Sequence, residues 1–178
     1  LRLYNQQNSS KSKSCCAGVD ITDAKKVAEQ YNFPHHVFDY QDKFFNGVIN
    51  KFVDSYANGE TPVPCIQCNQ TVKFSDLLKE SQNLNADALI TGHYAIRKGG
   101  LRKSKLFKAK DKTKDQSYFL FATLQDQLDY VRFPLGNYLK SEIRQMADDY
   151  NLSVSDSQDI CFVTSDSYRD LINKIQPN

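Results

Sequence analysis

The sequence predicts an α/β fold with a doubly wound, mostly parallel sheet, followed by the start of a second small domain. Two observations carry this prediction. In the first half, helix-type periodicities and short strand-like runs follow the order strand, helix, strand, helix, helix, strand. The last of these strands, residues 86–91, is apolar and ends at Gly92, and ligands of such sheets bind beyond the carboxyl ends of the strands.

Each element of the first half has a local signal. Asp20 can cap a helix whose apolar residues recur at i, i+3, i+4 and i+7, and Pro34 stops that helix. The prolines of residues 61–64 exclude a helix there because each restricts the residue before it, so Asn69 is the expected cap of the next helix. The predicted elements are a strand at 1–5, a helix at 20–31, a strand at 35–40, a helix at 45–56, a helix from 69 and a strand at 86–91.

The second half has weaker signals. Thr123 is the expected cap of a helix that carries Leu124, Leu128 and Val131, and residues 133–136 are typical of a turn. The other predicted elements are a strand at 105–109, a helical stretch at 118–121, a helix at 141–150, a strand at 160–163 and a helix at 168–175 capped by Asp166. We expect one domain over residues 1–163, with a basic insertion at about 97–114 and a helical segment at about 137–150, and the beginning of a second domain over 164–178.

The composition is that of a soluble globular protein, with 40% hydrophobic and 25% charged residues and a net charge of +2. No apolar run approaches the roughly 18 residues that a membrane span needs, and residues 1–4 do not resemble a signal peptide. The charge is uneven, because nine basic residues and one acid lie between Arg97 and Lys114. Such a segment suits a polyanionic partner, although a solvated, lysine-rich hairpin explains it equally well.

Five cysteines, an odd number, occur without a secretion signal, which predicts a reducing, cytoplasmic compartment. Cys65 and Cys68 form a C-x-x-C on a proline-constrained loop before a predicted helix. Three interpretations remain open for this pair. A helix N-terminus stabilises a thiolate and favours a nucleophilic or redox role, two thiols can hold a metal if further ligands exist, and the pair can be inert buried thiols.

The other candidate residues carry weaker signals. Cys161 has apolar neighbours and is typical of a core cysteine, whereas Cys15 and Cys16 lie in a polar stretch and look incidental. His93 follows Gly92 at a strand end and is either a ligand contact or a structural histidine. His35 and His36 look structural. Gly18-Val19-Asp20 lacks the leading apolar strand that a phosphate-binding loop requires, so we exclude that role.

Five ordered blocks together resemble one family, the tRNA-specific 2-thiouridylases that make 2-thiouridine at the wobble position. A single block would be weak evidence, but all five occur in the family's order over nearly the whole chain. They are residues 61–69 (TPVPCIQCN) with 72–74 (VKF), 91–94 (TGHY), 114–120 (KDQSYFL), 133–136 (FPLG) and 156–162 (DSQDICF).

The resemblance implies an adenine-nucleotide α-hydrolase-like, Rossmann-like fold and a two-step reaction. ATP, with Mg²⁺, would adenylate the C2 oxygen of the target uridine, and a cysteine persulfide would then deliver sulfur. Cys161 matches the cysteine that accepts the persulfide sulfur, and Cys68 matches the nucleophile that completes the transfer. Two thiols are consistent with this chemistry because a second thiol must break a persulfide.

Further roles are implied by position in the family's pattern. Leu1 and Gly92 match ATP contacts, and the loop of Val63, Pro64 and Cys65 matches the contact with the target base. His93 and the run Lys114, Asp115 and Gln116 match tRNA contacts. The target would be an unpaired anticodon-loop base, flipped into a pocket while the basic segment engages phosphates. A sulfur-carrier protein that delivers the persulfide sulfur is the other implied partner.

The sequence also departs from the family. The phosphate loop is absent and would lie upstream of Leu1, the C-terminal β-barrel is absent, and the chain looks a few residues short between Leu152 and Asp156. We therefore expect these residues alone to be inactive. Cys65 stands where some members carry Asp, which leaves room for an iron–sulfur centre on Cys65, Cys68 and Cys161. Two other functions stay open: a non-catalytic RNA-binding module with zinc or an iron–sulfur site on Cys65 and Cys68, and another ATP pyrophosphatase, such as an amide-forming ligase.

Overall fold

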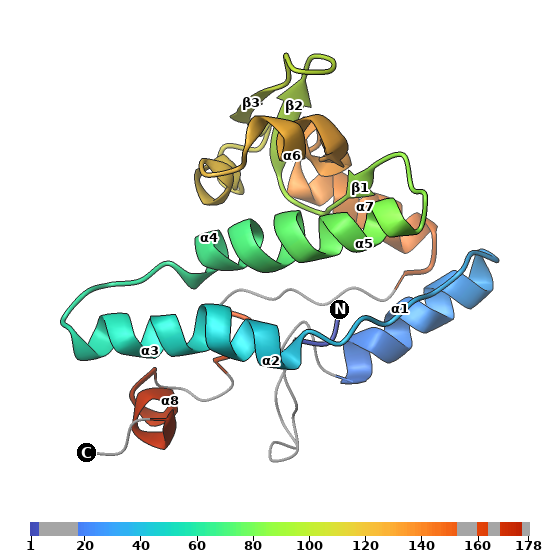
Figure 1. The fold of residues 1–178 in the computed structure, drawn as a ribbon. Coiled ribbons are helices and arrows are strands. Elements are labelled where there is room, and N and C mark those ends of the chain that lie inside the picture. Colours follow the sequence, from blue (N-terminus) through green and yellow to red (C-terminus); the bar gives the residue numbers. More distant parts are fainter. Residues whose placement is uncertain (4–17, 153–159, 164–167, 176–178) are drawn as a thin grey trace. The chain divides into compact units, whose positions relative to one another are not determined.

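The structure is a computed structural model that describes residues 1–3, 18–152, 160–163 and 168–175 (Figure 1). These residues combine helices with short strands, two of which pair in parallel, in agreement with the predicted α/β class. The chain divides into two compact units, one from residues 1–64 and 155–178 and one from residues 65–154. No helix of the described residues is both long enough and apolar enough to cross a lipid bilayer.

The first unit begins with a parallel bridge between Arg2 and Asp39, which joins the first and third predicted elements. The Arg2 amide donates to the Phe38 carbonyl at 2.9 Å, and the Tyr40 amide donates to the Arg2 carbonyl at the same distance. The first helix of this unit is α1 (Gly18–Gln30). It is followed by a continuous helical segment made of α2 (Gln41–Phe44), a π-helical stretch (Phe45–Ile49) and α3 (Asn50–Ala57). The predicted helix at 45–56 is thus part of a longer helical segment.

An aromatic cluster holds the C-terminal part of the first unit. Phe162 packs edge-on against Phe44 at 5.7 Å and Phe52 at 5.2 Å between ring centroids, and Tyr168 stacks on Tyr56 at 6.2 Å. Tyr168 opens α8 (Tyr168–Ile175), which has the predicted bounds. The strand predicted at 160–163 is wrong, because these residues form a turn in which the Val163 amide donates to the Ile160 carbonyl. Asp166, the predicted cap of α8, lies outside the described residues.

The second unit is built on a long helix. α4 (Pro64–Cys68), a π-helical stretch η2 (Asn69–Leu77) and α5 (Leu78–Asn83) run on without interruption. The prediction that Asn69 caps this helix is therefore wrong. The helix starts at Pro64, because proline lacks the amide hydrogen that the first turn leaves unpaired and its fixed φ suits that position.

Two short sheets pack with this helix. β1 (Leu89–Ile90) pairs in parallel with β4 (Val131–Arg132), and β2 (Ala95–Lys98) pairs antiparallel with β3 (Lys105–Lys108), with Ala95 opposite Lys108. Val131 was expected on a helix but lies in a strand. The core of the unit is made of apolar residues from these elements and the segments between them: Phe74, Leu78, Ala95, Leu120, Leu128, Val131 and Phe133.

Four short helical segments complete the unit: η3 (Ser117–Leu120), α6 (Gln125–Tyr130), η4 (Pro134–Asn137) and α7 (Lys140–Asp149). The N-cap of α6 is Leu124 rather than the predicted Thr123, and its amide donates to the Gln127 side chain at 2.9 Å. Gly136 in η4 lies so close to β2 that a Cβ there would collide with the Ala95 carbonyl oxygen. The turn at 133–136 thereby fixes the start of β2.

Candidate functional site

The C-x-x-C pair lies inside a helix, not on the predicted loop. Cys65 is exposed in the first turn of α4, whereas Cys68 is buried, with 6% of its surface accessible. Val63, just before the helix, is exposed, and Pro64 is buried. This arrangement separates the two thiols chemically, because one faces solvent near the positive end of the helix and the other is shielded by protein.

Cys161 lies on the turn of residues 160–163 in the first unit. Its side chain is half-buried, and the adjacent Phe162 is fixed in the aromatic cluster. The core position expected from its apolar neighbours thus belongs to Phe162 rather than to the cysteine. Among the described residues, Cys65, Cys68 and Cys161 are thiols that form no disulfide. Cys15, Cys16 and residues 156–159 of the last block lie outside the described residues.

The two positions that match ATP contacts belong to different units. Leu1 is half-buried beside the Arg2–Asp39 bridge, and Gly92 is exposed after β1. A Cβ at Gly92 would meet only the Leu135 side chain, at 3.7 Å. The packing among described residues therefore does not by itself require glycine there.

His93 is held as a neutral imidazole in the second unit. Its Nδ1 and the Thr91 Oγ1 are 2.8 Å apart, and its ring packs against Phe74 and Phe133 at 6.0 and 5.9 Å between centroids. Burial, with a smaller contribution from the positive charge of Lys73, lowers the pKa of His93 to about 3. An imidazole in this state can contact RNA only as an uncharged hydrogen-bonding group.

The structure brings the 114–116 run against the residue after His93. The Gln116 amide donates to the Tyr94 carbonyl at 2.8 Å, and the Tyr94 amide donates to the Gln116 side-chain oxygen at 2.9 Å. Asp115 accepts from the Ala109 amide and from the Ser117 hydroxyl, both at 2.8 Å. Partial burial raises the pKa of Asp115, but these hydrogen bonds outweigh it and the net shift is downward. Its carboxylate therefore braces the loop that presents Lys114.

Asn69 links the C-x-x-C helix to η3, the helical turn that follows this loop, a role that the sequence did not predict. Its side-chain amide donates to the Phe119 carbonyl at 3.1 Å, while its Oδ1 is buried without a hydrogen-bond partner among the described residues. Lys73 lies on the same helix as Asn69 and near His93, and the sequence predicted no role for it either. The signal that the sequence offered was that both residues belong to the first block; the structure buries Asn69 and half-buries Lys73.

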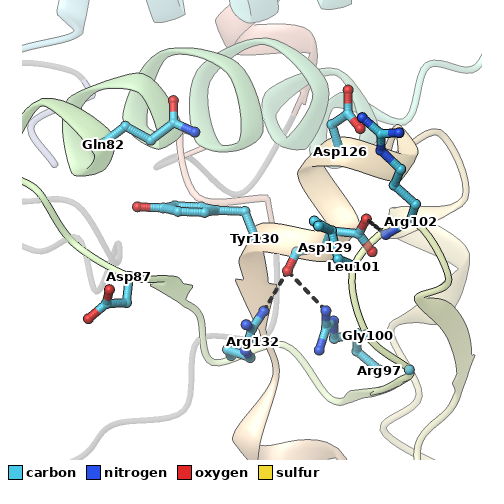
Figure 2. A pocket seen from close by; sticks show the side chains of 11 residues that line it. Gln82, Asp87, Arg97, Gly100, Leu101, Arg102, Asp126, Asp129, Tyr130 and Arg132 are labelled. Carbon is cyan, nitrogen blue, oxygen red and sulfur yellow. Dashed lines mark hydrogen bonds between the residues drawn. The ribbon is translucent and has the colours of Figure 1, made fainter.

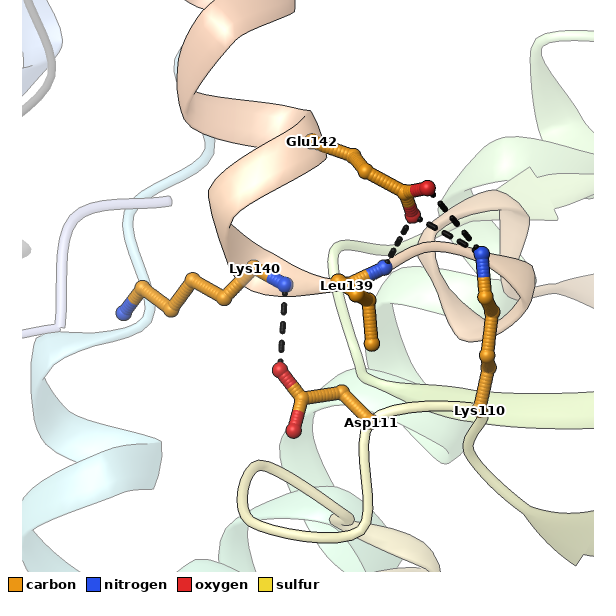
Figure 3. A network of polar contacts seen from close by, with 5 residues as sticks. All are labelled: Lys110, Asp111, Leu139, Lys140 and Glu142. Atoms are coloured by element: carbon orange, nitrogen blue, oxygen red, sulfur yellow. Dashed lines mark hydrogen bonds and ion pairs between the residues drawn. The ribbon is translucent and has the colours of Figure 1, made fainter.

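The basic segment is only partly available to a ligand. Arg97 donates to the carbonyls of Leu128 and Asp129, Lys98 lies over the Phe107 ring, and Lys110 pairs with Glu142 at 3.0 Å. Figure 3 shows the Lys110 ion pair beside the Leu139 and Lys140 amides, which donate to Glu142 and Asp111. The exposed lysines of this segment whose side chains form no hydrogen bond, ion pair or cation–π contact with other described residues are Lys103, Lys105, Lys108, Lys112 and Lys114.

A pocket of about 660 Å³ lies where the tip of the β2–β3 hairpin meets α5 and α6 (Figure 2). Arg97 and Arg132 both donate to the Asp129 carbonyl oxygen, at 2.9 and 2.8 Å. The Asp129 carboxylate accepts from the backbone amides of Arg102 and Ser104. Asp129 therefore ties the hairpin to α6, and the pocket walls are built by structural hydrogen bonds.

A metal centre finds no support in the described residues. No group of three or more His, Cys, Asp or Glu side chains within 1–3, 18–152, 160–163 and 168–175 could hold a metal ion. Structural zinc sites use four protein ligands, and most iron–sulfur clusters are held by cysteine thiolates. The zinc and iron–sulfur alternatives therefore stay predictions from the sequence.

Comparison with known proteins defines the class. Residues 1–165 match the family model described as "tRNA methyl transferase HUP domain", so the chain belongs to this family, and the adenine-nucleotide α-hydrolase-like fold is confirmed. The particular relatives are tRNA-specific 2-thiouridylases MnmA: the chain is 52% identical over 182 aligned residues to that of Orientia tsutsugamushi (strain Boryong) and 51% to that of Rickettsia peacockii (strain Rustic). The matches cover all of this chain but only 49% and 50% of those proteins. The family predicted from the five blocks is therefore confirmed, and the chain spans about half the length of these relatives.

Proposed function

We propose that this chain is the catalytic part of an enzyme that transfers sulfur to C2 of the wobble uridine of tRNA. The observation that carries the proposal is the similarity of the whole chain to 2-thiouridylases, combined with thiols at both positions that the reaction needs. The chemistry divides into activation of the base and delivery of sulfur.

ATP is the proposed activating substrate, used with Mg²⁺. Its adenylyl group would be transferred to the C2 oxygen of uridine, pyrophosphate would leave, and AMP would later carry away that oxygen. The HUP family assignment supports use of an adenine nucleotide. Leu1 and Gly92 are the residues of this chain that we assign to ATP by their family positions; Gly92 is exposed after β1.

Sulfur delivery is assigned to two cysteines. Cys161 would carry a persulfide received from a sulfur-carrier protein, and its half-buried place on a turn suits transient access by a partner. The terminal sulfur would attack C2, after which the Cys68 thiolate would attack the Cys161 sulfur. That step leaves sulfur on the base and joins the cysteines as a disulfide, which an external thiol must reduce before the next cycle. A reducing compartment such as the cytoplasm would supply it.

RNA recognition is assigned to the two loops joined by Gln116 and Tyr94. His93 and Lys114 would contact the tRNA, with Asp115 and Gln116 fixing the loop that carries Lys114. Val63, Pro64 and Cys65 would face the target base at the start of the C-x-x-C helix. Unpaired anticodon bases can be splayed out for such a contact.

The test is thiolation of tRNA by the whole protein carrying single substitutions. Cys68→Ala and Cys161→Ala are expected to abolish 2-thiouridine, measured by mass spectrometry of nucleosides from digested tRNA. Gln70→Ala, at an exposed position of the same helical segment, is the matched control and is expected to keep activity. Thiolation that survives in both alanine variants would refute the proposed mechanism, and activity lost equally in all three would point to a structural role of the helix.

A further inference from the structure

Two aromatic rings next to the proposed RNA-binding loop have no role in the function described so far. Tyr118 and Phe121 are 63% and 68% exposed, although aromatic side chains are normally buried. Their ring centroids lie 6.2 Å apart with an interplanar angle of 43°. Together they form an apolar surface that begins two residues after Gln116.

This surface is rigidly held. In the sequence, Phe119 and Leu120 lie between the two residues that carry these rings. The carbonyl of Phe119 accepts from the Asn69 side chain at 3.1 Å, and Leu120 is part of the core of the unit. At either end the Phe119 amide donates to the Gln116 carbonyl and the Thr123 amide to the Leu120 carbonyl. Two exposed rings on a fixed backbone lose little conformational freedom when a flat ligand stacks on them.

The charge around the rings indicates which ligand fits. The preceding segment has an excess of eight positive charges, and its exposed lysines outside internal ion pairs include Lys112 and Lys114. Aromatic platforms beside cationic tracks are how proteins bind single-stranded nucleic acid, because the rings stack on bases while the cations follow the phosphates. An apolar protein segment would gain nothing from such a concentration of lysine.

We propose that Tyr118 and Phe121 form a stacking platform for an unpaired anticodon-loop base that neighbours the modified uridine. This inference rests on the proposed function and names a contact in addition to it. Stacking tolerates any base, so the platform would add affinity and orient the loop without reading its sequence.

A cycle of protein and RNA changes tests the platform. The whole protein, carrying Cys68→Ala in every sample to prevent turnover, is titrated with an anticodon stem–loop in which each loop nucleotide in turn is made abasic. Tyr118→Ala and Phe121→Ala are each expected to weaken binding about tenfold. At one loop position, removal of the base should lower the affinity for the protein that keeps both rings. The same removal should cause no further loss of affinity for the alanine variants. Tyr118→Phe should bind normally, and Tyr150→Ala is the control for an exposed ring elsewhere.

The outcomes separate the two proposals. Alanine variants that bind as tightly as the parent, or that lose affinity equally for all abasic stem–loops, would overturn the platform alone. A lower melting temperature of the variants with unchanged RNA affinity would assign the rings to a protein contact and also overturn it. Failure of the parent protein to bind the stem–loop would refute the proposed function together with the platform.

Discussion

At the scale of single residues, the neutral state of His93 has a measurable consequence. The unfolded chain protonates histidine near pH 6.5, whereas burial and Lys73 lower the pKa in the folded chain to about 3. A falling pH therefore protonates the unfolded state first. The stabilisation is complete above pH 6.5 and is lost as the pH falls from 6.5 towards 3.

We expect the free energy of unfolding to drop by about 2 kcal/mol between pH 7 and pH 5 because of His93 alone. Urea unfolding followed by circular dichroism at several pH values measures this change. His93→Asn should remove most of the dependence, while His36→Asn, which changes an exposed histidine, should leave it intact. Equal pH dependence in the parent and His93→Asn proteins would show that His93 is not buried as described.

Residue roles also mark the limit of sequence reasoning. The five blocks located Cys68, Cys161 and Gln116 as candidates, because an ordered set of motifs preserves chemistry. They did not indicate the reciprocal hydrogen bonds between Gln116 and Tyr94 or the link from Asn69 to Phe119, since these join residues 22 and 50 positions apart. Spacing along one element cannot predict such pairs.

At the scale of elements, helices with clear periodicity were predicted well. The helix expected at 141–150 spans 140–149, and the one at 168–175 matches. Short apolar runs were ambiguous: the run at 160–163 is a turn because Phe162 fits among the rings of α2 and α3, and four apolar residues cannot distinguish a strand from a buried turn. The helix start was misplaced at Asn69 although Pro64 at its first position was the better signal.

The close approach of η4 to β2 predicts a contrast between two glycines. Gly136→Ala would place a methyl group against the Ala95 carbonyl and should destabilise the protein by about 1–3 kcal/mol, as overpacking does. Gly100→Ala, in the hairpin, meets nothing within 4 Å and should change stability by less than about 0.5 kcal/mol. Chemical denaturation of both variants measures the difference, and a Gly136→Ala protein as stable as the parent would contradict the packing of η4.

At the scale of the whole molecule, the net charge of +2 hides a local concentration of charge. Because Lys110 of the 97–114 segment is paired with Glu142, the field that a polyanion meets comes mainly from the other basic residues of the segment. The family blocks predicted the fold class and domain type from sequence, but which lysines form ion pairs depends on contacts such as Lys110 with Glu142, which only the folded chain provides.

Neutralising the exposed lysines is expected to weaken tRNA binding and its dependence on salt. The triple change of Lys103, Lys105 and Lys108 to Gln should lower the slope of log affinity against log salt by about 0.7–0.9 for each phosphate that is no longer neutralised. Fluorescence anisotropy titrations between about 50 and 200 mM salt measure this slope. Lys25→Gln with Lys26→Gln, which alters ion-paired lysines of α1, is the control. An unchanged slope in the triple variant would assign these lysines to solvated surface.

The π-helical stretch between Cys68 and Leu78 sets the rotation of α4 relative to α5 about their common axis. Each residue of an α-helix turns the chain by roughly 100° about the helix axis. The wider turns of the π-helical stretch therefore change the direction in which side chains of α4 point relative to those of α5. Phe74 and Leu78 are buried in the core, so the helical geometry of residues 69–73 determines the direction in which the two thiols point. Deleting the exposed Gln70 would therefore rotate Cys65 and Cys68 about the helix axis relative to the core, although both cysteines would remain in the sequence.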